Sequence, residues 1–326
     1  MKIGILSFAH MHAYSYAAAL TRLPGVEFTG LADDDAERGQ AAAAEFATRY
    51  FPTAADLLAT DIDGVIICSA NVEHEELALA AAARGKHILC EKPIATTIAA
   101  ANRMIAACRE NNVQLGVAFP CRLHPAARRL REEIQAGKLG RVMAIRATNH
   151  GSLPPGWFLD REKAGGGAVM DHTVHVVDLL RWFLGQEVTR VYAEAGTLLH
   201  DIAIDDCGLL SLELSGGAYA TLDTSWSRPE GFPTWGDVTM EIVGTGGTAY
   251  LDLFSQNLAV YGPGELTTRY ENWGSDADYL LVQDFVTSIA AGRQPLVSGQ
   301  DGLKALEVAL AAYRAAATQE PVAVGN

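Results

Sequence analysis

Residues 87–93 read His87-Ile88-Leu89-Cys90-Glu91-Lys92-Pro93, and they decide the fold that we expect for this chain. The first four form an apolar run typical of a buried strand, which then ends in a carboxylate, an ammonium and a proline. Proline fixes its own φ and disfavours the helical conformation in the residue before it, so the chain turns at Lys92. Ligands of open α/β sheets bind at the carboxyl ends of the strands, which makes Glu91 and Lys92 candidate site residues. The alternative is a solvated ion pair that caps the strand.

Around this stretch, short apolar runs alternate with helical segments from residue 1 to about residue 120. Strands are expected at 3–6, 26–32, 65–68, 87–90 and 113–119, and helices at 13–23, 36–50, 73–84 and 97–111. Strands that alternate with helices imply a parallel, doubly wound sheet. We therefore predict an α/β, Rossmann-type dinucleotide-binding domain over residues 1–120.

The pattern changes after residue 120. Helices are expected at 125–136, 168–184, 277–291 and 301–317, and strands at 141–148, 188–197, 207–214, 217–226, 238–243, 248–253 and 257–261. This order predicts an α+β domain with a large, mostly antiparallel sheet over residues 121–326, for substrate binding and oligomerisation. The closing helix is a candidate to pack back on the first domain. One face of the half-apolar sheet needs cover, which predicts a homodimer or homotetramer.

Composition limits the class of protein. A chain of 326 residues exceeds one ordinary core, and its 49% apolar residues suffice to fill two. A formal net charge of −14 argues against nucleic-acid partners, which require a clustered basic face. Its runs of apolar residues stay below the roughly 18–20 that a membrane span needs. Five cysteines without metal or redox spacing indicate reduced thiols, so we expect a cytoplasmic protein with no membrane partner.

The first strand is followed by Ser7-Phe8-Ala9-His10-Met11-His12 in place of the G-x-G-x-x-G fingerprint of dinucleotide sites. Backbone N–H groups at a helix start bind phosphate even without glycine. Residues Ser7, Phe8, Ala9 and His10 are therefore candidate cofactor contacts. His10 and His12 also allow a second interpretation, a metal-dependent lyase or hydrolase, although the sequence shows no further ligands and we predict no metal site.

Asp33 ends the second predicted strand, near where an acid that binds the cofactor ribose belongs. Together with its acidic neighbours it would repel a 2′-phosphate, which favours NAD over NADP as the cofactor. The alternative role for such an aspartate is a helix N-cap. The segment after the central strand offers three further candidates to cover the cofactor, Ser69, Asn71 and His74.

Three glycines at 165–167 precede a helix on which Asp171 and His175 are four residues apart and share one face. Asp178 continues the same stripe. An imidazole oriented by a carboxylate is a general acid/base pair that titrates near neutral pH. The alternative is a helix-starting acid and a partly buried histidine.

The Cys-Glu-Lys-Pro strand end, the helix pattern of residues 165–178 and the order of the two domains together resemble the glucose-fructose oxidoreductase / inositol dehydrogenase / MocA (Gfo/Idh/MocA) family. The resemblance runs nearly end to end. It implies that Lys92 lies between nicotinamide and substrate and that His175, matched with Asp171, exchanges the substrate hydroxyl proton. Arg122 matches a basic position of the family that follows the last strand of the nucleotide domain.

The resemblance implies an NAD-dependent oxidoreductase that transfers hydride between nicotinamide and a hydroxyl or carbonyl of a sugar, polyol or cyclitol. We expect the substrate to contact aromatic and basic residues of the loop, helix and strand near this site, namely Arg122, Trp157, His172 and Trp226. Because a fold does not determine function, a non-catalytic sugar- or nucleotide-sensing protein remains the other alternative.

Overall fold

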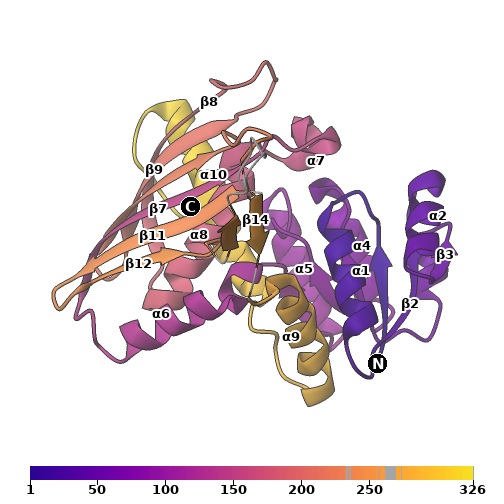
Figure 1. Ribbon diagram of the computed structural model, residues 1–326. Helices are drawn as coiled ribbons and strands as arrows, with labels where there is room; N and C mark the ends of the chain where they lie inside the picture. Colours follow the sequence, from indigo (N-terminus) through magenta and orange to yellow (C-terminus); the bar gives the residue numbers. More distant parts are fainter. Residues whose placement is uncertain (233, 235, 256, 261–268, 273, 326) are drawn as a thin grey trace. The chain divides into compact units, whose positions relative to one another are not determined.

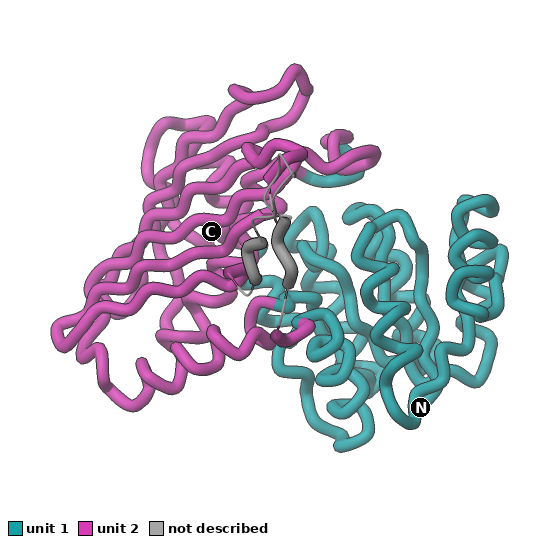
Figure 2. Tube along the Cα trace, in the orientation of Figure 1, with its two compact units in different colours: residues 1–120, 162–165, 277–306 teal, residues 121–161, 166–276, 307–326 magenta. Residues whose placement is uncertain are grey.

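The computed structural model describes residues 1–232, 234, 236–255, 257–260, 269–272 and 274–325 (Figure 1). These described residues fall into two compact units (Figure 2). Unit 1 comprises residues 1–120, 162–165 and 277–306, and unit 2 comprises residues 121–161, 166–276 and 307–326.

Within the described residues, unit 1 contains a six-stranded parallel sheet in the order β3-β2-β1-β4-β5-β6. Its strands are β1 (Lys2–Leu6), β2 (Glu27–Ala32), β3 (Arg49–Phe51), β4 (Gly64–Ile67), β5 (His87–Cys90) and β6 (Leu115–Val117). The strand order reverses between β1 and β4, which creates the switch point where doubly wound sheets bind ligands. The predicted Rossmann-type sheet is confirmed.

Helices connect these strands and cover the sheet (Figure 1). Unit 1 holds α1 (His12–Arg22), α2 (Ala36–Glu45), α3 (Ala54–Leu58), the 3-10 turn η1 (Asn71–Glu73), α4 (His74–Ala82), α5 (Ile98–Glu110) and α9 (Ala277–Ala291). Side-chain oxygens of Asp35, Thr53 and Thr97 accept a hydrogen bond from the third residue of α2, α3 and α5, respectively, which explains where these helices begin. Helix α1 packs against α9, and α4 packs against α5.

One predicted helix was too long. The alanine-rich segment 36–50 favours a helix, but α2 ends at Glu45 and Arg49–Phe51 forms the edge strand β3 beside β2. Ala47 has a positive φ of 49°, which turns the chain between the two elements. The ring of Phe51 lies over Gly30 of β2, where a Cβ would meet it at 2.5 Å. Packing between strands therefore overrides local helix propensity here.

Unit 2 contains, in its described part, a mixed seven-stranded sheet in the order β12-β11-β7-β10-β9-β8-β15. Its strands are β7 (Val142–Gly151), β8 (Val188–Gly196), β9 (Cys207–Leu214), β10 (Tyr219–Ser225), β11 (Gly236–Gly244), β12 (Thr248–Asp252) and β15 (Val322–Ala323). Only the β7–β10 pairing is parallel, so the predicted mostly antiparallel sheet is confirmed. The predicted strand 257–261 corresponds to β13 (Asn257–Val260), which pairs with β14 (Arg269–Asn272), and residue 261 lies outside the described residues.

Helix α8 (Ala168–Leu184) lies against β7, β8, β9 and β10 and forms the core of unit 2 with them. Most of its residues are buried, including the polar side chains predicted to carry chemistry. Other helical segments are η2 (Pro120–Leu123), α6 (Pro125–Gln135), η3 (Gly156–Leu159), α7 (Arg161–Ala164) and α10 (Gly299–Thr318). Across the described residues, no helix has both the length and the apolar character needed to cross a membrane.

Candidate active site

The first βα turn closes without glycine. Ser7 has a φ of 68°, the left-handed conformation that a glycine usually supplies at this place. Its N–H donates to the carbonyl of Ala32 at 2.7 Å, and its hydroxyl oxygen accepts the N–H of Ala9 at 3.1 Å. The N–H of His10 donates to the carbonyl of Cys68 at 2.9 Å, which fixes the turn to the end of β4. Local hydrogen bonds thus replace the missing glycines.

Asp33 is buried at the end of β2, as predicted for an acid that binds ribose. Its carboxylate accepts the N–H groups of Phe8 at 2.6 Å and Asp35 at 2.9 Å. It also accepts two hydrogen bonds from Arg38, from Nε at 2.9 Å and from Nη2 at 2.5 Å. The sequence analysis did not identify Arg38 as a partner of Asp33. Its position in the first turn of α2, five residues after Asp33, was the feature of the sequence that could have indicated this contact.

A cavity of about 320 Å³ opens at the carboxyl ends of β1 and β2. Apolar side chains make up most of its walls, and four acidic residues, of which only Asp33 is buried, complete a lining of Leu6, Ser7, Ala32, Asp33, Asp34, Pro52, Thr53, Ala54, Glu73, Glu76 and Leu77. Apolar walls beside one buried acceptor suit an adenine ring and the hydroxyls of its ribose. The residues present therefore fit the adenosine half of a dinucleotide.

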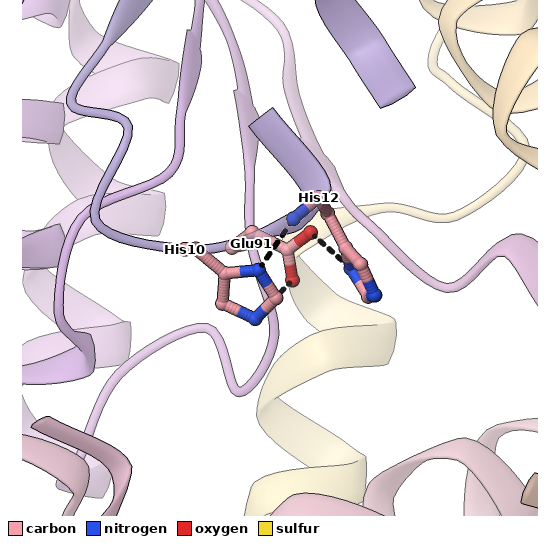
Figure 3. A group of neighbouring side chains, drawn as sticks. All are labelled: His10, His12 and Glu91. Carbon is pink, nitrogen blue, oxygen red and sulfur yellow. Dashed lines mark hydrogen bonds and ion pairs between the residues drawn. The ribbon is translucent and has the colours of Figure 1, made fainter. Parts of the chain in front are cut away.

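Glu91 is fully buried at the end of β5 and is surrounded by hydrogen-bond donors. The Tyr16 hydroxyl donates to Oε1 at 2.5 Å, the Lys92 N–H donates to Oε2 at 2.9 Å, and His12 Nδ1 lies 2.9 Å from Oε1 (Figure 3). Burial alone would raise the pKa of Glu91, but the nearby His12 and Lys92 lower it below its usual range. Glu91 is therefore an ionised carboxylate inside unit 1.

The predicted pair His10 and His12 forms one group with Glu91, with the potential ligand atoms within 4.8 Å of one another. However, the N–H of His12 donates to His10 Nδ1 at 3.2 Å, so that ring nitrogen must carry a lone pair. A neutral His10 then has its proton on Nε2, 3.7 Å from Glu91 Oε2. A protonated ring nitrogen does not ligate a metal, so this arrangement favours an imidazole–carboxylate cluster.

Lys92 is 3% exposed, and its peptide bond to Pro93 is cis. The carbonyl of Pro93 lies 3.0 Å from Nδ1 of His74, the first residue of α4. Burial lowers the pKa of His74, so the neutral ring donates its Nδ1 proton to this carbonyl. His74, predicted as a cofactor contact, thus anchors the turn that carries Lys92.

Three further predicted cofactor contacts, Phe8, Ser69 and Asn71, are also buried in unit 1. The Phe8 ring packs edge-on against Tyr14, with ring centroids 5.1 Å apart. The side-chain amide of Asn71 donates to the carbonyl of Ala164 at 2.8 Å. These three residues are therefore part of the packed interior of unit 1, next to the carboxyl ends of β1 and β4.

The start of α8 is fixed by Asp205, which the sequence analysis did not single out. Its carboxylate accepts the N–H of Gly167 and the N–H of Val169, each at 2.9 Å, and the Tyr313 hydroxyl at 2.9 Å. A Cβ on Gly167 would lie 1.9 Å from the Asp205 carbonyl oxygen, so this position requires glycine. Gly167 thus allows the backbone of Asp205 to lie close to the start of α8.

Asp171 lies in the first turn of α8 and is 8% exposed. Its Oδ2 accepts the indole N–H of Trp226 at 3.1 Å and lies 3.6 Å from Nε2 of His172. Trp226 and His172, which we predict to contact the substrate, are 1% and 0% exposed. The Trp226 indole thus holds the Asp171 carboxylate within unit 2. His175 follows one turn later on the same helix and is 6% exposed.

Arg122 and Asp178 form a buried ion pair in unit 2, with Nε–Oδ2 at 2.7 Å and Nη2–Oδ1 at 2.6 Å. The sequence analysis placed Arg122 at the substrate and Asp178 on the stripe of His175. In the structure the two side chains form an ion pair with each other, and the substrate contact of Arg122 stays a prediction. Trp157, also predicted at the substrate, is half-buried in η3 and stacks on Phe158, with ring centroids 3.9 Å apart.

Comparison with known proteins places this geometry in a family. The chain is 32% identical to the 1,5-anhydro-D-fructose reductase of Ensifer adhaerens, over 94% of this chain and 93% of that protein. It is 29% identical to the myo-inositol 2-dehydrogenase of Thermotoga maritima, over 78% and 77% of the two chains. The crystal structure of GenD2 from gentamicin A biosynthesis, in complex with NAD, superposes with a TM-score of 0.92 at 26% identity and covers 100% of this chain and 97% of that one.

Residues 1–119 match the oxidoreductase family with an NAD-binding Rossmann fold, and residues 127–250 match the GFO/IDH/MocA C-terminal domain. The two matches cover most of the chain and agree with the parallel sheet of unit 1 and the mixed sheet of unit 2. This chain therefore belongs to the GFO/IDH/MocA family of NAD-binding oxidoreductases.

Proposed function

We propose that this protein is an NAD-dependent oxidoreductase that acts on a CH–OH group, or the matching carbonyl, of a sugar, polyol or cyclitol. The observation that carries the proposal is the turn after β5, where buried Glu91 and Lys92 lie at the carboxyl edge of an NAD-binding Rossmann sheet. The substrate class rests on relatives named for an anhydro sugar and for inositol.

Residues 1–120 would hold the cofactor. The Asp33 carboxylate and the apolar cavity beside it suit the adenosine half, and the turn that begins at Ser7 lies next to them at the end of β1. The acidic side chains of Asp33 and Asp34 disfavour a 2′-phosphate and so support NAD over NADP. Arg38 opposes this preference because it places a cation at the same edge.

Residues 121–326 would bind the substrate and present α8 to it. During oxidation His175 removes the hydroxyl proton, and Asp171, held by the Trp226 indole, orients and stabilises the imidazole. The ammonium of Lys92 would donate a hydrogen bond to a substrate oxygen and stabilise the negative charge that develops on it. A bound nicotinamide cofactor would supply the acceptor or the donor of the hydride.

The exposed face of the seven-stranded sheet supports self-association. Leu209, Tyr219 and Tyr250 lie on this face and are 57%, 59% and 66% exposed. Large apolar side chains on one open sheet face are typical of an interface. A homodimer or homotetramer through this sheet is therefore part of the proposal, and sedimentation analysis would measure its size.

Two measurements test the proposed function. Calorimetric titration with NAD⁺, NADH, NADP⁺ and NADPH is expected to give micromolar binding of NAD(H) and weaker binding of NADP(H). A spectrophotometric screen of inositols, aldoses and 1,5-anhydrofructose is then expected to give turnover with at least one compound. Binding without turnover by any sugar, polyol or cyclitol would instead support a sensing protein.

A further inference from the structure

Five N–H groups of the first βα turn already donate inside the chain. Those of Phe8, Ala9 and His12 donate to a carboxylate, a hydroxyl and a ring nitrogen at 2.6, 3.1 and 3.2 Å. Those of Ser7 and His10 donate to backbone carbonyls at 2.7 and 2.9 Å. In glycine-rich turns such groups point at the cofactor pyrophosphate. This turn therefore needs another source of positive charge for a bound pyrophosphate.

His12 is placed to supply it. It is the first residue of α1, at the end of the turn, and its side chain is 27% exposed (Figure 3). It occupies the third position of the fingerprint, where dinucleotide-binding proteins have a glycine that lets the helix pack closely on the sheet, at the helix end that faces the pyrophosphate. Its Nδ1 faces Glu91 at 2.9 Å, so Nε2 is the nitrogen directed away from that carboxylate.

The charges around His12 favour its cation. Burial disfavours the charged ring, but the attraction and the hydrogen bond of Glu91 outweigh it and raise the pKa of His12. Asp278 of α9 adds attraction, and Lys92 opposes it. Burial raises the pKa of Tyr16 well above its usual value, so this hydroxyl stays protonated and donates to Glu91. His10 approaches the same carboxylate through Nε2.

We propose that the His12 imidazolium, oriented by the buried Glu91 carboxylate, binds the cofactor pyrophosphate and takes the place of the glycine-turn backbone donors. The inference rests on the proposed use of NAD, and it adds a residue that recognises the negative charge of the pyrophosphate. Binding is then coupled to protonation: NADH affinity is highest at pH values where His12 is charged, and it declines as pH rises through the raised pKa of the ring.

The test compares two ligands and three variants by calorimetry between pH 6 and pH 9. NADH carries the pyrophosphate, and adenosine lacks it. The variants are His12→Asn, His12→Gly and, as a matched control, His87→Asn. His87 is a half-buried histidine at the amino end of β5, whereas His12 lies near the carboxyl ends of the strands. Thermal melts verify that each variant is folded.

Losing a charge-assisted hydrogen bond is expected to raise the Kd of His12→Asn for NADH roughly 10-fold or more at pH 6.5 and to abolish the pH dependence. Adenosine binding should change less than about twofold in the same variant, since the lost contact is to phosphate. The His87→Asn control is expected to retain both the affinity and the pH dependence of the wild type.

Three results would overturn the inference. The first is that His12→Gly binds NADH more tightly than the wild type at every pH, because the imidazole would then only obstruct the turn. The second is that EDTA abolishes NADH binding and Zn²⁺ restores it, because the cluster would then be a metal site. The third is wild-type NADH binding that His12→Asn leaves unchanged. Failure of the wild type to bind either ligand at any pH would reject the proposed cofactor use itself.

Discussion

The guanidinium of Arg122 donates two hydrogen bonds to the carboxylate of Asp178, at 2.7 and 2.6 Å, and neither residue is more than 3% exposed. Removing one partner of such a pair leaves the other charge buried and uncompensated. We expect Arg122→Met to lower the free energy of unfolding by about 3–5 kcal/mol, measured by urea denaturation. The exposed Arg128 on α6 provides the control, and Arg128→Met should change stability by less than about 0.5 kcal/mol.

This prediction separates two roles for Arg122. If Arg122→Met kept its stability and only raised KM, the arginine would serve the substrate, as the sequence pattern first suggested. Replacing both partners, as in Arg122→Met with Asp178→Leu, should recover much of the lost stability because no unpaired charge remains.

Lys92→Met is expected to lower kcat about 100- to 1,000-fold, the usual cost of removing one donor to a developing oxyanion. Its Kd for NADH should stay within a few-fold of the wild type. The matched control is Lys86→Met, because Lys86 lies in the same unit and its ammonium donates only to the carbonyls of Thr60 and Ile62 among the contacts described. Equal losses in kcat and in NADH affinity would contradict a role in chemistry.

Asp33 and Asp34 are adjacent carboxylates in different environments: the first is buried, and the second is 84% exposed. Asp33→Asn should weaken NADH binding about 10- to 100-fold, the range for buried hydrogen bonds to a charged group. It should also improve NADPH binding relative to NADH, because Arg38 remains beside the ribose position. Asp34→Asn is the control, and an effect as large as that of Asp33→Asn would reject the assignment.

Asp205→Ala removes the acceptor of two N–H groups at the start of α8. Two unsatisfied groups, at about 1–3 kcal/mol each, should together cost about 2–6 kcal/mol of stability. Because α8 carries Asp171 and His175, kcat should fall as well, even though Asp205 contacts neither in the hydrogen bonds described. Unfolding curves and initial rates would be compared with Asp201→Ala, an exposed acid in the same loop whose change should be neutral.

His150 provides a pH-dependent test of unit 2. Burial disfavours its cation, but hydrogen bonds to Asp223 and Asp237 raise the pKa of His150 to about 9. Because the pKa of His150 is higher in the folded protein than in the unfolded chain, protonation of its ring stabilises the fold. This stabilisation is complete below pH 6.5 and is lost as pH rises through about 9. The stability difference between wild type and His150→Asn should therefore reach about 3 kcal/mol at pH 6 and shrink by pH 9.5. A difference that stays constant over this range would contradict the ion pair.

Short-range spacing predicted much of the fold. The strand 87–90, its Glu91-Lys92-Pro93 ending and the helix 168–184 appear in the structure with the predicted bounds. Each depends on a local property: an apolar run, a proline that stops it, or a helical repeat after glycine. Asp33 likewise follows from its place at a strand end.

The remaining features depend on partners distant in the chain. Gly167 and Asp205 are 38 residues apart, and Arg122 and Asp178 are 56 apart, so no local pattern signals either contact. Trp226 similarly lies 55 residues from Asp171, so no local pattern signals the hydrogen bond between its indole and that carboxylate. Only the topology of unit 2 brings these pairs together.

The hydrogen bonds described for the first βα turn end on residues of unit 1, whereas those at the start of α8 end on Asp205 and Tyr313 of unit 2. We therefore expect coenzyme preference and substrate range to depend on separate parts of the chain, which recombination between relatives can exchange. A chimera that takes residues 1–120 from a relative with a glycine-rich turn is expected to acquire that relative's coenzyme preference while it keeps its own substrates.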